Sequence, residues 1–244
     1  MPQINRIRVN NVKYNFGTQY YDDFMMRFHC RNTIYDLANG GGKSLLMLLL
    51  LQNVIPNCTL DEKQPVEKLF RPGGGNTVIH SLIEWKLDIA NNDGYKYMTT
   101  GFCARKAKDT EADGTEADGI SGRFSAAEEA PAGRDNASEE YFNYWIFYRE
   151  FGENDIKNLP LTKNGERITY NGLKQYLREL EHNDFHVSVK IFDRKGEYQS
   201  FISKYGLYES EWEIIRGINK TEGHVRTYFE SHYRTTRKVV EDLL

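Results

Sequence analysis

The residues with the clearest chemical potential form one short run, in which three glycines are followed by a lysine and a serine. Glycines lack a Cβ atom, so successive backbone N–H groups can turn toward a single anion. A lysine directly after such a loop can reach the outer phosphates of a nucleotide, and a serine hydroxyl can bind Mg²⁺. The run therefore predicts an ATP–Mg²⁺ site with Ser44 as the metal ligand and these nucleotide-binding residues: Asn39, Gly40, Gly41, Gly42, Lys43 and Ser44.

The sequence on either side of this run fits a phosphate-binding loop at all but one position. Residues 33–38 include β-branched, aromatic and small side chains, and a run of Leu and Met after the loop continues to Leu51. These patterns predict the order strand, glycine loop, buried helix that such a loop requires. The strict pattern GxxxxGK[ST] would place a glycine where this chain has Leu37. The alternative is a glycine-rich turn that only caps a helix, but three glycines before Lys-Ser favour the nucleotide site.

Composition places the chain among globular proteins without an obvious membrane or global nucleic-acid signal. Its 244 residues are 39% hydrophobic and 27% charged, with a net charge of −3. Any DNA contact must therefore be local. The longest apolar run is too short to span a bilayer, and the first residues lack the apolar core of a signal peptide. Three widely spaced cysteines without a CxxC pair indicate a reduced setting, so we expect a cytoplasmic protein with no membrane partner.

Hydrophobic periodicity predicts an alternation of strands and helices around the glycine loop. A helix is expected from Thr169, as its N-cap, to about His182. Residues 187–202 are interpreted as a hairpin, because Gly196 and charged residues separate two apolar stretches. Residues 107–140 are rich in Ala, Glu, Asp, Gly and Ser, which predicts a flexible insertion. The expected strands cover residues 4–16, 24–36, 77–88, 95–106 and 141–151, and an amphipathic helix is expected from about residue 222 to 244.

Other chemistry finds little support in the sequence. A P-loop ATPase also needs an acidic residue after an apolar strand to hold Mg²⁺ and position water. Asp193 comes closest, but we interpret it as part of a turn. His182 and His186 have the spacing of a helical metal pair, yet no third ligand is evident, so a surface position is favoured over a zinc site. No catalytic residue is assigned within this chain.

Taken together, these features resemble the N-terminal half of the ATPase head of SMC (structural maintenance of chromosomes) proteins. That family opens with a strand that carries a lysine near its end, and a glycine loop ending in Lys-Ser follows the second strand. Residues 10–14 occupy the first position here, with Lys13 as the lysine, and residues 39–44 occupy the second. The helix exit at residues 53–60 resembles that of Muk-type heads, including the Jet-type SMC subunit of Wadjet plasmid-defence systems.

The resemblance implies an α/β fold, namely the N-terminal lobe of an ABC-type P-loop NTPase head. A mixed β-sheet would surround a buried P-loop helix, and the chain would end in the start of a coiled-coil helix. Residues 1–222 would form the lobe and residues 223–244 the coiled-coil start. The resemblance adds Lys13, Arg71 and Gln199 as candidate nucleotide-binding residues. For Arg71, a structural role in its loop is an equally good interpretation.

The resemblance also implies partners and a reaction. ATP binding would join two such heads, and hydrolysis by the full-length dimer would separate them and drive DNA loop capture or extrusion, in chromosome organisation or plasmid defence. The partners would be a second head, the chain's own C-terminal head half, kleisin and kite-type subunits, and DNA near the basic residues 216–238. The alternatives are the head of an ABC-type DNA-repair ATPase and a standalone P-loop kinase or nucleotide-binding module. The last of these needs an acidic Mg²⁺ ligand such as Asp193.

Overall fold

The computed structural model describes residues 2–60, 66–71, 76–88, 94–107, 139–163 and 165–220. Most of the predicted insertion at 107–140 and the predicted helix at 222–244 lie outside these ranges. Within them, no helix has both the length and the hydropathy that crossing a bilayer requires.

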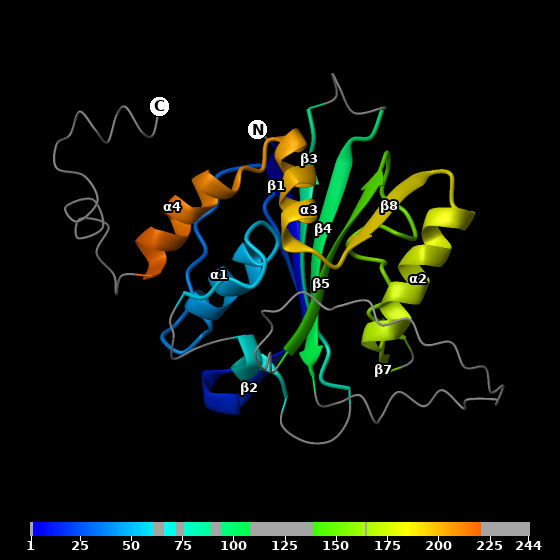
Figure 1. Ribbon diagram of the computed structural model, residues 1–244. Coiled ribbons are helices and arrows are strands. Elements are labelled where there is room, and N and C mark those ends of the chain that lie inside the picture. The colour runs from blue at the N-terminus through cyan, green and yellow to red at the C-terminus, as the bar shows by residue number, and fades with distance from the viewer. Residues whose placement is uncertain are drawn as a thin grey trace, which may run out of the picture.

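A six-stranded sheet in the order β2-β1-β3-β4-β5-β8 forms the centre of this α/β protein (Figure 1). Every pair of neighbouring strands is antiparallel, so the expectation of a mixed sheet is wrong for the described residues. Parallel neighbouring strands would need crossover connections. In this sheet, each strand instead runs in the direction opposite to that of the strand beside it. The strands are β1 (Gln3–Tyr14), β2 (Gln19–Arg27), β3 (Ile79–Lys86), β4 (Tyr97–Lys106), β5 (Glu139–Tyr148) and β8 (Val187–Phe192). Two short strands, β6 (Thr162–Lys163) and β7 (Glu166–Arg167), pair separately.

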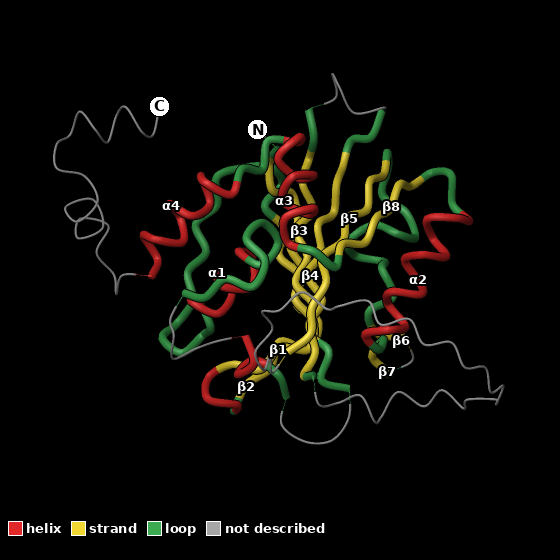
Figure 2. Tube along the Cα trace, viewed as in Figure 1, coloured by secondary structure: helices red, strands yellow, loops and turns green. Residues whose placement is uncertain are grey.

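Helices cover both faces of the sheet (Figure 2). Helices α1 (Lys43–Leu51), α3 (Lys195–Ile202) and α4 (Glu209–Lys220) share one core with the first face, whereas α2 (Tyr170–Asn183) packs in a second core on the other. The short 3₁₀ helices are η1 (Asn15–Gly17), η2 (Val66–Leu69) and η5 (Ser203–Tyr205). The prediction for α2 is confirmed, including its N-cap, because the Thr169 hydroxyl accepts a hydrogen bond from the Gly172 N–H.

A backbone irregularity at Asn11 in β1 changes which side chains face α1. Ile7 and Val9 belong to the α1 core, as their alternation predicts. Asn11 then adopts a left-handed conformation with φ 60°, and pairing with β2 passes from Asn10 directly to Val12. The register with β2 is the same before and after Asn11, so no residue is inserted, yet the side chains in the α1 core change from Ile7 and Val9 to Val12 and Tyr14.

Two segments differ from their sequence-based predictions. The strand expected over residues 24–36 ends at Arg27, and the chain reaches the glycine loop through irregular structure, not through a strand. The hairpin expected at 187–202 is instead strand β8 followed by helix α3. The reason is packing: Tyr198 and Ile202, four residues apart, are both buried against the α1 core, which is the spacing of one helix face.

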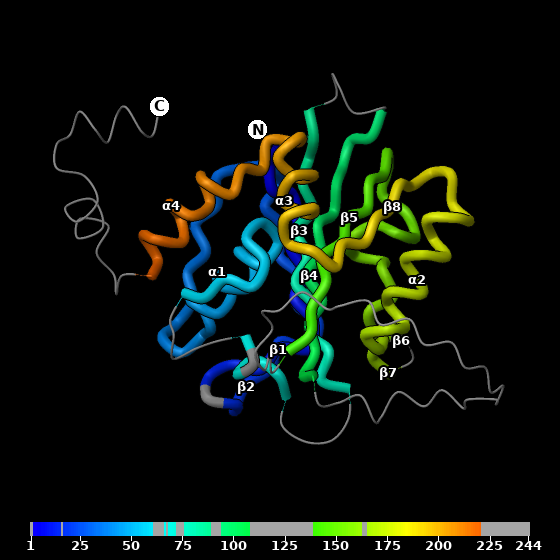
Figure 3. Tube along the Cα trace, viewed as in Figure 1, coloured from blue at the N-terminus to red at the C-terminus, as the bar shows by residue number. Residues whose placement is uncertain are grey.

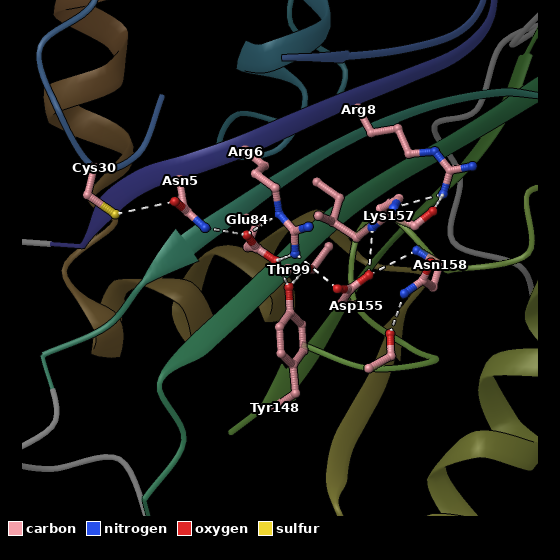
Figure 4. A network of polar contacts seen from close by, with 12 residues as sticks. Asn5, Arg6, Arg8, Cys30, Glu84, Thr99, Tyr148, Asp155, Lys157 and Asn158 are labelled. Atoms are coloured by element: carbon pink, nitrogen blue, oxygen red, sulfur yellow. Dashed lines mark hydrogen bonds and ion pairs between the residues drawn. The ribbon is translucent and has the colours of Figure 1, made fainter. Parts of the chain in front are cut away.

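The opposite face of the sheet carries buried charge (Figure 4). Glu84 on β3 is fully buried and receives two hydrogen bonds from Arg6, at 2.7 and 2.6 Å. Arg6 also contacts Asp155 at 3.2 Å, and the Tyr148 hydroxyl donates to Glu84. Such a pair tolerates burial only when its remaining donors and acceptors are satisfied, and here Asn5 donates to Glu84 as well.

Arg8 attaches the loop after β5 to this face. Its guanidinium binds Asp23 through two hydrogen bonds of 2.7 Å. The third nitrogen donates to the carbonyl groups of Ile156, Lys157 and Leu159, at 2.8 to 3.0 Å. The loop therefore lies against the sheet because one buried guanidinium satisfies three of its carbonyl oxygens.

Gly101 on β4 leaves the space that the Tyr144 ring of the neighbouring strand β5 fills. A Cβ atom at position 101 would lie 2.1 Å from the Tyr144 ring. Both residues are part of a tightly packed sheet face, so neither can move away without disturbing its neighbours.

We therefore expect Gly101→Ala to lower the free energy of unfolding by about 1–3 kcal/mol, the usual cost of overpacking a core. Urea unfolding followed by circular dichroism measures this. Gly196→Ala is the matched control, because no atom lies within 4 Å of the added Cβ in helix α3. If the two variants unfold at the same urea concentration, the assignment of Gly101 as a packing glycine is wrong.

His80 lies on the same polar face and is 1% exposed. Neither of its ring nitrogens has a hydrogen-bond partner within the described ranges. Burial, together with the nearby Arg8 charge, lowers the pKa of His80 from 6.5 to about 3. The imidazole is therefore neutral in the folded protein across the physiological range.

This lowered pKa makes stability depend on pH. The unfolded chain binds a proton at His80 below about pH 6.5 and the folded chain does not, so stability falls as the pH drops from 6.5 toward 3. Between pH 6.5 and 4.5 the loss due to His80 is about 2 kcal/mol. Urea unfolding measures this in the wild-type protein and in His80→Leu. The free energy of unfolding of the variant should fall by about 2 kcal/mol less than that of the wild type over this interval. At pH 8, His80 is neutral in both the folded and the unfolded chain. The difference in stability between wild type and His80→Leu at that pH therefore measures the packing effect of the substitution alone. An unchanged slope would contradict a neutral buried His80.

Candidate functional site

The glycine loop and the first turn of α1 form the candidate site. Gly40 and Gly42 adopt left-handed conformations, with φ 81° and 83°, that other residues rarely reach. The Gly41 N–H donates to the Ala38 carbonyl at 3.0 Å, which closes a tight turn. Gly42 is the N-cap of α1, and Lys43 and Ser44 are its first residues. The structure thus places the six predicted residues of this loop together, at the exposed start of a buried helix.

Two tyrosines from the β1–β2 hairpin hold the loop. The rings of Tyr14 and Tyr21 stack with centroids 4.4 Å apart. The Tyr21 hydroxyl donates to the Gly41 carbonyl at 2.7 Å. A Cβ at position 42 would lie 3.1 Å from that hydroxyl and 3.2 Å from the Tyr14 ring. Burial raises the pKa of Tyr21 to about 12, so the hydroxyl keeps the proton that it donates.

The start of α1 offers unpaired donors. The first intrahelical bond runs from the Leu46 N–H to the Gly42 carbonyl, at 2.8 Å. The N–H groups of Lys43 and Ser44 have no acceptor among the described residues, as expected for the first turn of a helix. The first turn contains no acidic side chain. Free N–H groups, the helix dipole and the Lys43 charge therefore all favour an anion here.

Lys43 folds back over its own loop. Its ammonium group donates to the Leu37 carbonyl at 2.6 Å. Leu37 is the position at which the strict sequence pattern has a glycine, and its side chain packs beside Gly41, where an added Cβ would lie 3.2 Å from the Leu37 Cβ. Leu37 thus closes the start of the loop, and its carbonyl oxygen is the present partner of the Lys43 charge.

The other end of α1 is fixed by side chains from the sheet and from α3. Ser81 on β3 donates to the Leu49 carbonyl at 2.7 Å, and Asn143 on β5 donates to the Gln52 carbonyl at 3.1 Å. The Tyr198 hydroxyl donates to the Asn53 carbonyl at 2.6 Å. The carbonyl end of the helix is therefore buried and satisfied, so the only end of α1 open to a ligand is its positive N-terminal end.

A mostly apolar pocket of about 340 Å³ adjoins the loop. Lys43 and Ser44 line one side of it, and Tyr35 and Phe28 contribute aromatic rings. Within the described ranges, no group of three or more His, Cys, Asp or Glu side chains lies close enough together to hold a metal ion. Ser44 is accordingly the one predicted Mg²⁺ ligand that the structure places at this pocket.

Lys13 and Arg71 lie near the same hairpin but on its other side. Tyr14 contacts the loop, so its neighbour Lys13 leaves β1 toward the opposite face. Arg71 stacks over the Tyr20 ring, 4.2 Å from its centroid, and pairs with Asp22. The Asp22 carboxylate also contacts Arg167, at 3.1 Å. These contacts place Arg71 in a structural network on the face away from the glycine loop.

Gln199 and Asp193 are distant from the loop. Gln199 lies on α3 next to Tyr198, which contacts the end of α1 opposite the loop. A nine-residue helix is about 13 Å long, so Gln199 does not reach the loop in this arrangement. Asp193 follows β8, at the sheet edge opposite β2, and pairs with Lys174 at 2.6 Å. His182 and His186, for which the sequence favours a surface position over a zinc site, are both exposed, and His182 contacts the Arg178 carbonyl.

Sequence reasoning missed the residues that position the loop. Tyr21 and Tyr14 carry no local motif, and the partners at the end of α1 come from β3, β5 and α3. Only the expectation that a buried helix end must find partners could have pointed to them.

Neither a protein-family model nor a curated protein matches the chain. The geometry of the site therefore carries the functional argument.

Removing the Tyr21 hydroxyl tests whether it holds the loop. Tyr21→Phe keeps the stacked ring and loses the hydrogen bond to Gly41, which contributes about 0.5–1.5 kcal/mol. We expect faster amide hydrogen exchange at residues 40–44, with little change elsewhere, measured by mass spectrometry. Tyr20→Phe, on the opposite side of β2, is the control and should leave exchange in the loop unchanged. Equal exchange in both variants would show that the loop does not depend on Tyr21.

Proposed function

We propose that the loop at residues 39–44 binds the phosphates of ATP with Mg²⁺. The observation that carries this proposal is the free, positively polarised start of α1, framed by two left-handed glycines and followed by Lys43 and Ser44. Free backbone donors and a lysine at one point are the requirements for holding a triphosphate. Ser44 supplies the hydroxyl for Mg²⁺.

In the proposed binding step, Lys43 changes partner. Its ammonium group leaves the Leu37 carbonyl and contacts the outer phosphates, while the loop amides contact the inner ones. The exchange replaces a neutral acceptor by a charged one, and hydrogen bonds between charged groups are the stronger kind. The Tyr21–Gly41 hydrogen bond keeps the loop backbone in place while the lysine moves.

We further propose that the chain is the ATP-binding half of an SMC-like ATPase head. Support comes from the order of parts: a β1–β2 hairpin, a glycine loop, a buried helix, and an antiparallel sheet packed on that helix. Hydrolysis also requires an acidic residue that holds Mg²⁺ and positions water, and this proposal assigns no residue of the chain to that role. That residue, and the loop that completes the site, would then come from the C-terminal head half and from a second head. Kleisin and kite-type subunits and DNA are the partners that this proposal implies.

The competing functions differ in what completes the site. A DNA-repair head of the ABC type would use the same loop, so ATP-dependent self-association of the full-length protein supports both. A standalone kinase would need its own acidic Mg²⁺ ligand. The position of Asp193, at the far sheet edge and paired with Lys174, argues against it in that role.

The nucleotide proposal predicts that Lys43→Ala weakens Mg²⁺–ATP binding about tenfold or more, because a charged hydrogen bond to phosphate is lost. Titration with a fluorescent ATP analogue measures the dissociation constant. Lys190→Ala is the matched control, since Lys190 lies on β8 at the other edge of the sheet. The same affinity in the wild-type chain and in Lys43→Ala, with both folded by circular dichroism, would refute the proposed site.

A further inference from the structure

An open cavity of about 460 Å³ lies on the face of the sheet opposite α1, over the buried charge network shown in Figure 4. Its lining residues come from the start of β1, the end of β2 and the turn after it, the start of β4 and the loop after β5. Figure 3 traces the chain through these elements by colour. Arg6 forms part of its floor, eight residues along β1 from Tyr14, which contacts the glycine loop. At about 3.3 Å per residue, the two sites are roughly 25 Å apart.

An exposed aromatic ring forms one wall of this cavity. Phe151 is 53% exposed, although a phenylalanine normally avoids water. The Arg6 guanidinium lies 4.3 Å from the ring centroid, and the Tyr97 ring is 4.7 Å away, centroid to centroid. Arg6 is itself held by Glu84 and Asp155. Arg6 and Tyr97 thus hold the Phe151 ring in place, and the exposed half of its surface is accessible to a planar group.

Cationic side chains line the rest of the cavity. Arg27 is paired in register with Arg6, so both leave the same face of the sheet. Neither Arg27 nor Lys157 forms an ion pair with a carboxylate of the described residues. The one carboxylate in the lining, Asp155, already accepts from Arg6 and from the N–H groups of Lys157 and Asn158. The cavity therefore keeps an excess of positive charge in a protein whose net charge is −3.

The backbone at the rim is strained. His29, which lines the cavity, and Cys30 both have positive φ, at 53° and 56°, without being glycine. The carbonyls of Asn5 and Ile4 hold this turn by accepting the N–H groups of His29 and Cys30, each at 3.2 Å. Such conformations cost free energy and concentrate at binding and catalytic sites. Here the turn places the His29 imidazole at the cavity, beside the end of β2 that carries Arg27.

From these observations we propose that the cavity is a second binding site, which takes a nucleoside phosphate independently of the glycine loop. The base stacks on Phe151, and the phosphate lies between Arg27, His29 and Lys157. A simple inorganic anion would not use the exposed ring, and an acidic peptide would not use its flat face. Stacking combined with basic side chains is the recognition chemistry of single nucleotides and of unpaired nucleic-acid strands. A free nucleotide and a nucleic-acid strand share this chemistry, and the experiment below distinguishes them.

The experiment uses the full chain with Lys43→Ala, so that the glycine loop is silenced, in buffer with EDTA to remove Mg²⁺. Isothermal titration calorimetry is performed with adenosine 5′-monophosphate and, separately, with a 5′-phosphorylated single-stranded decathymidylate. Saturable binding of either probe is expected, and it should weaken as salt is raised because phosphate contacts are involved. Binding of the monophosphate indicates a free nucleotide as the ligand, and binding of the decathymidylate alone indicates a nucleic-acid strand.

Substitutions then locate the site. Phe151→Ala should weaken binding about tenfold or more through lost stacking, and Arg27→Ala with Lys157→Ala should reduce both affinity and its salt dependence. Phe185→Ala is the matched control, because Phe185 is 94% exposed but lies after α2. No binding of either probe at millimolar concentration, or equal effects of Phe151→Ala and Phe185→Ala, would overturn the proposal. Neither outcome bears on the glycine loop, which is tested by Mg²⁺–ATP in the chain with intact Lys43.

Discussion

The buried ion pair between Arg6 and Glu84 is the interaction on which much of this structure depends. A fully buried carboxylate is costly unless several donors surround it, and Glu84 receives them from β1 and β5. The same guanidinium extends to Asp155, and Arg8 beside it satisfies three carbonyl oxygens of the following loop. These contacts make a polar patch on the part of this sheet face formed by β1 and β3, whereas α2 packs on an apolar part of the same face. The hydrogen bonds of Arg6 and Arg8 hold the loop after β5 against the sheet.

The opposite face of the sheet packs on α1, and its polar side chains bind only one end of that helix. The helix is buried by its leucines, and its carbonyl end is satisfied by Ser81, Asn143 and Tyr198 from three separate elements. With that end closed, the N-terminal end faces outward with free N–H groups, and Tyr21 holds the loop in front of it. The proposed phosphate site is thus a consequence of how the helix is anchored at its far end.

The two proposed sites use the same sheet in different ways. The glycine loop sits over the apolar side, at the end of β1 near Tyr14, and the second cavity lies over the polar side near Arg6. Asn11, with its left-handed backbone, lies between them. On the Arg6 side of Asn11, strand alternation puts Ile7 and Val9 on the apolar side and Arg6 and Arg8 on the other.

The sequence by itself determined the glycine loop, the buried helix after it, the helix capped by Thr169 and most strands, because these follow from local spacing and capping. It did not determine the antiparallel pairing, the course of residues 28–42 or the helix at 195–202. Each of these depends on contacts between segments far apart in the chain, such as Tyr198 with Asn53. Only the tertiary structure separated Lys13, Arg71 and Gln199 from the loop and brought Tyr14 and Tyr21 to it. The reason is physical: a motif fixes the backbone around itself, whereas the partners of that backbone are chosen by packing across the sheet.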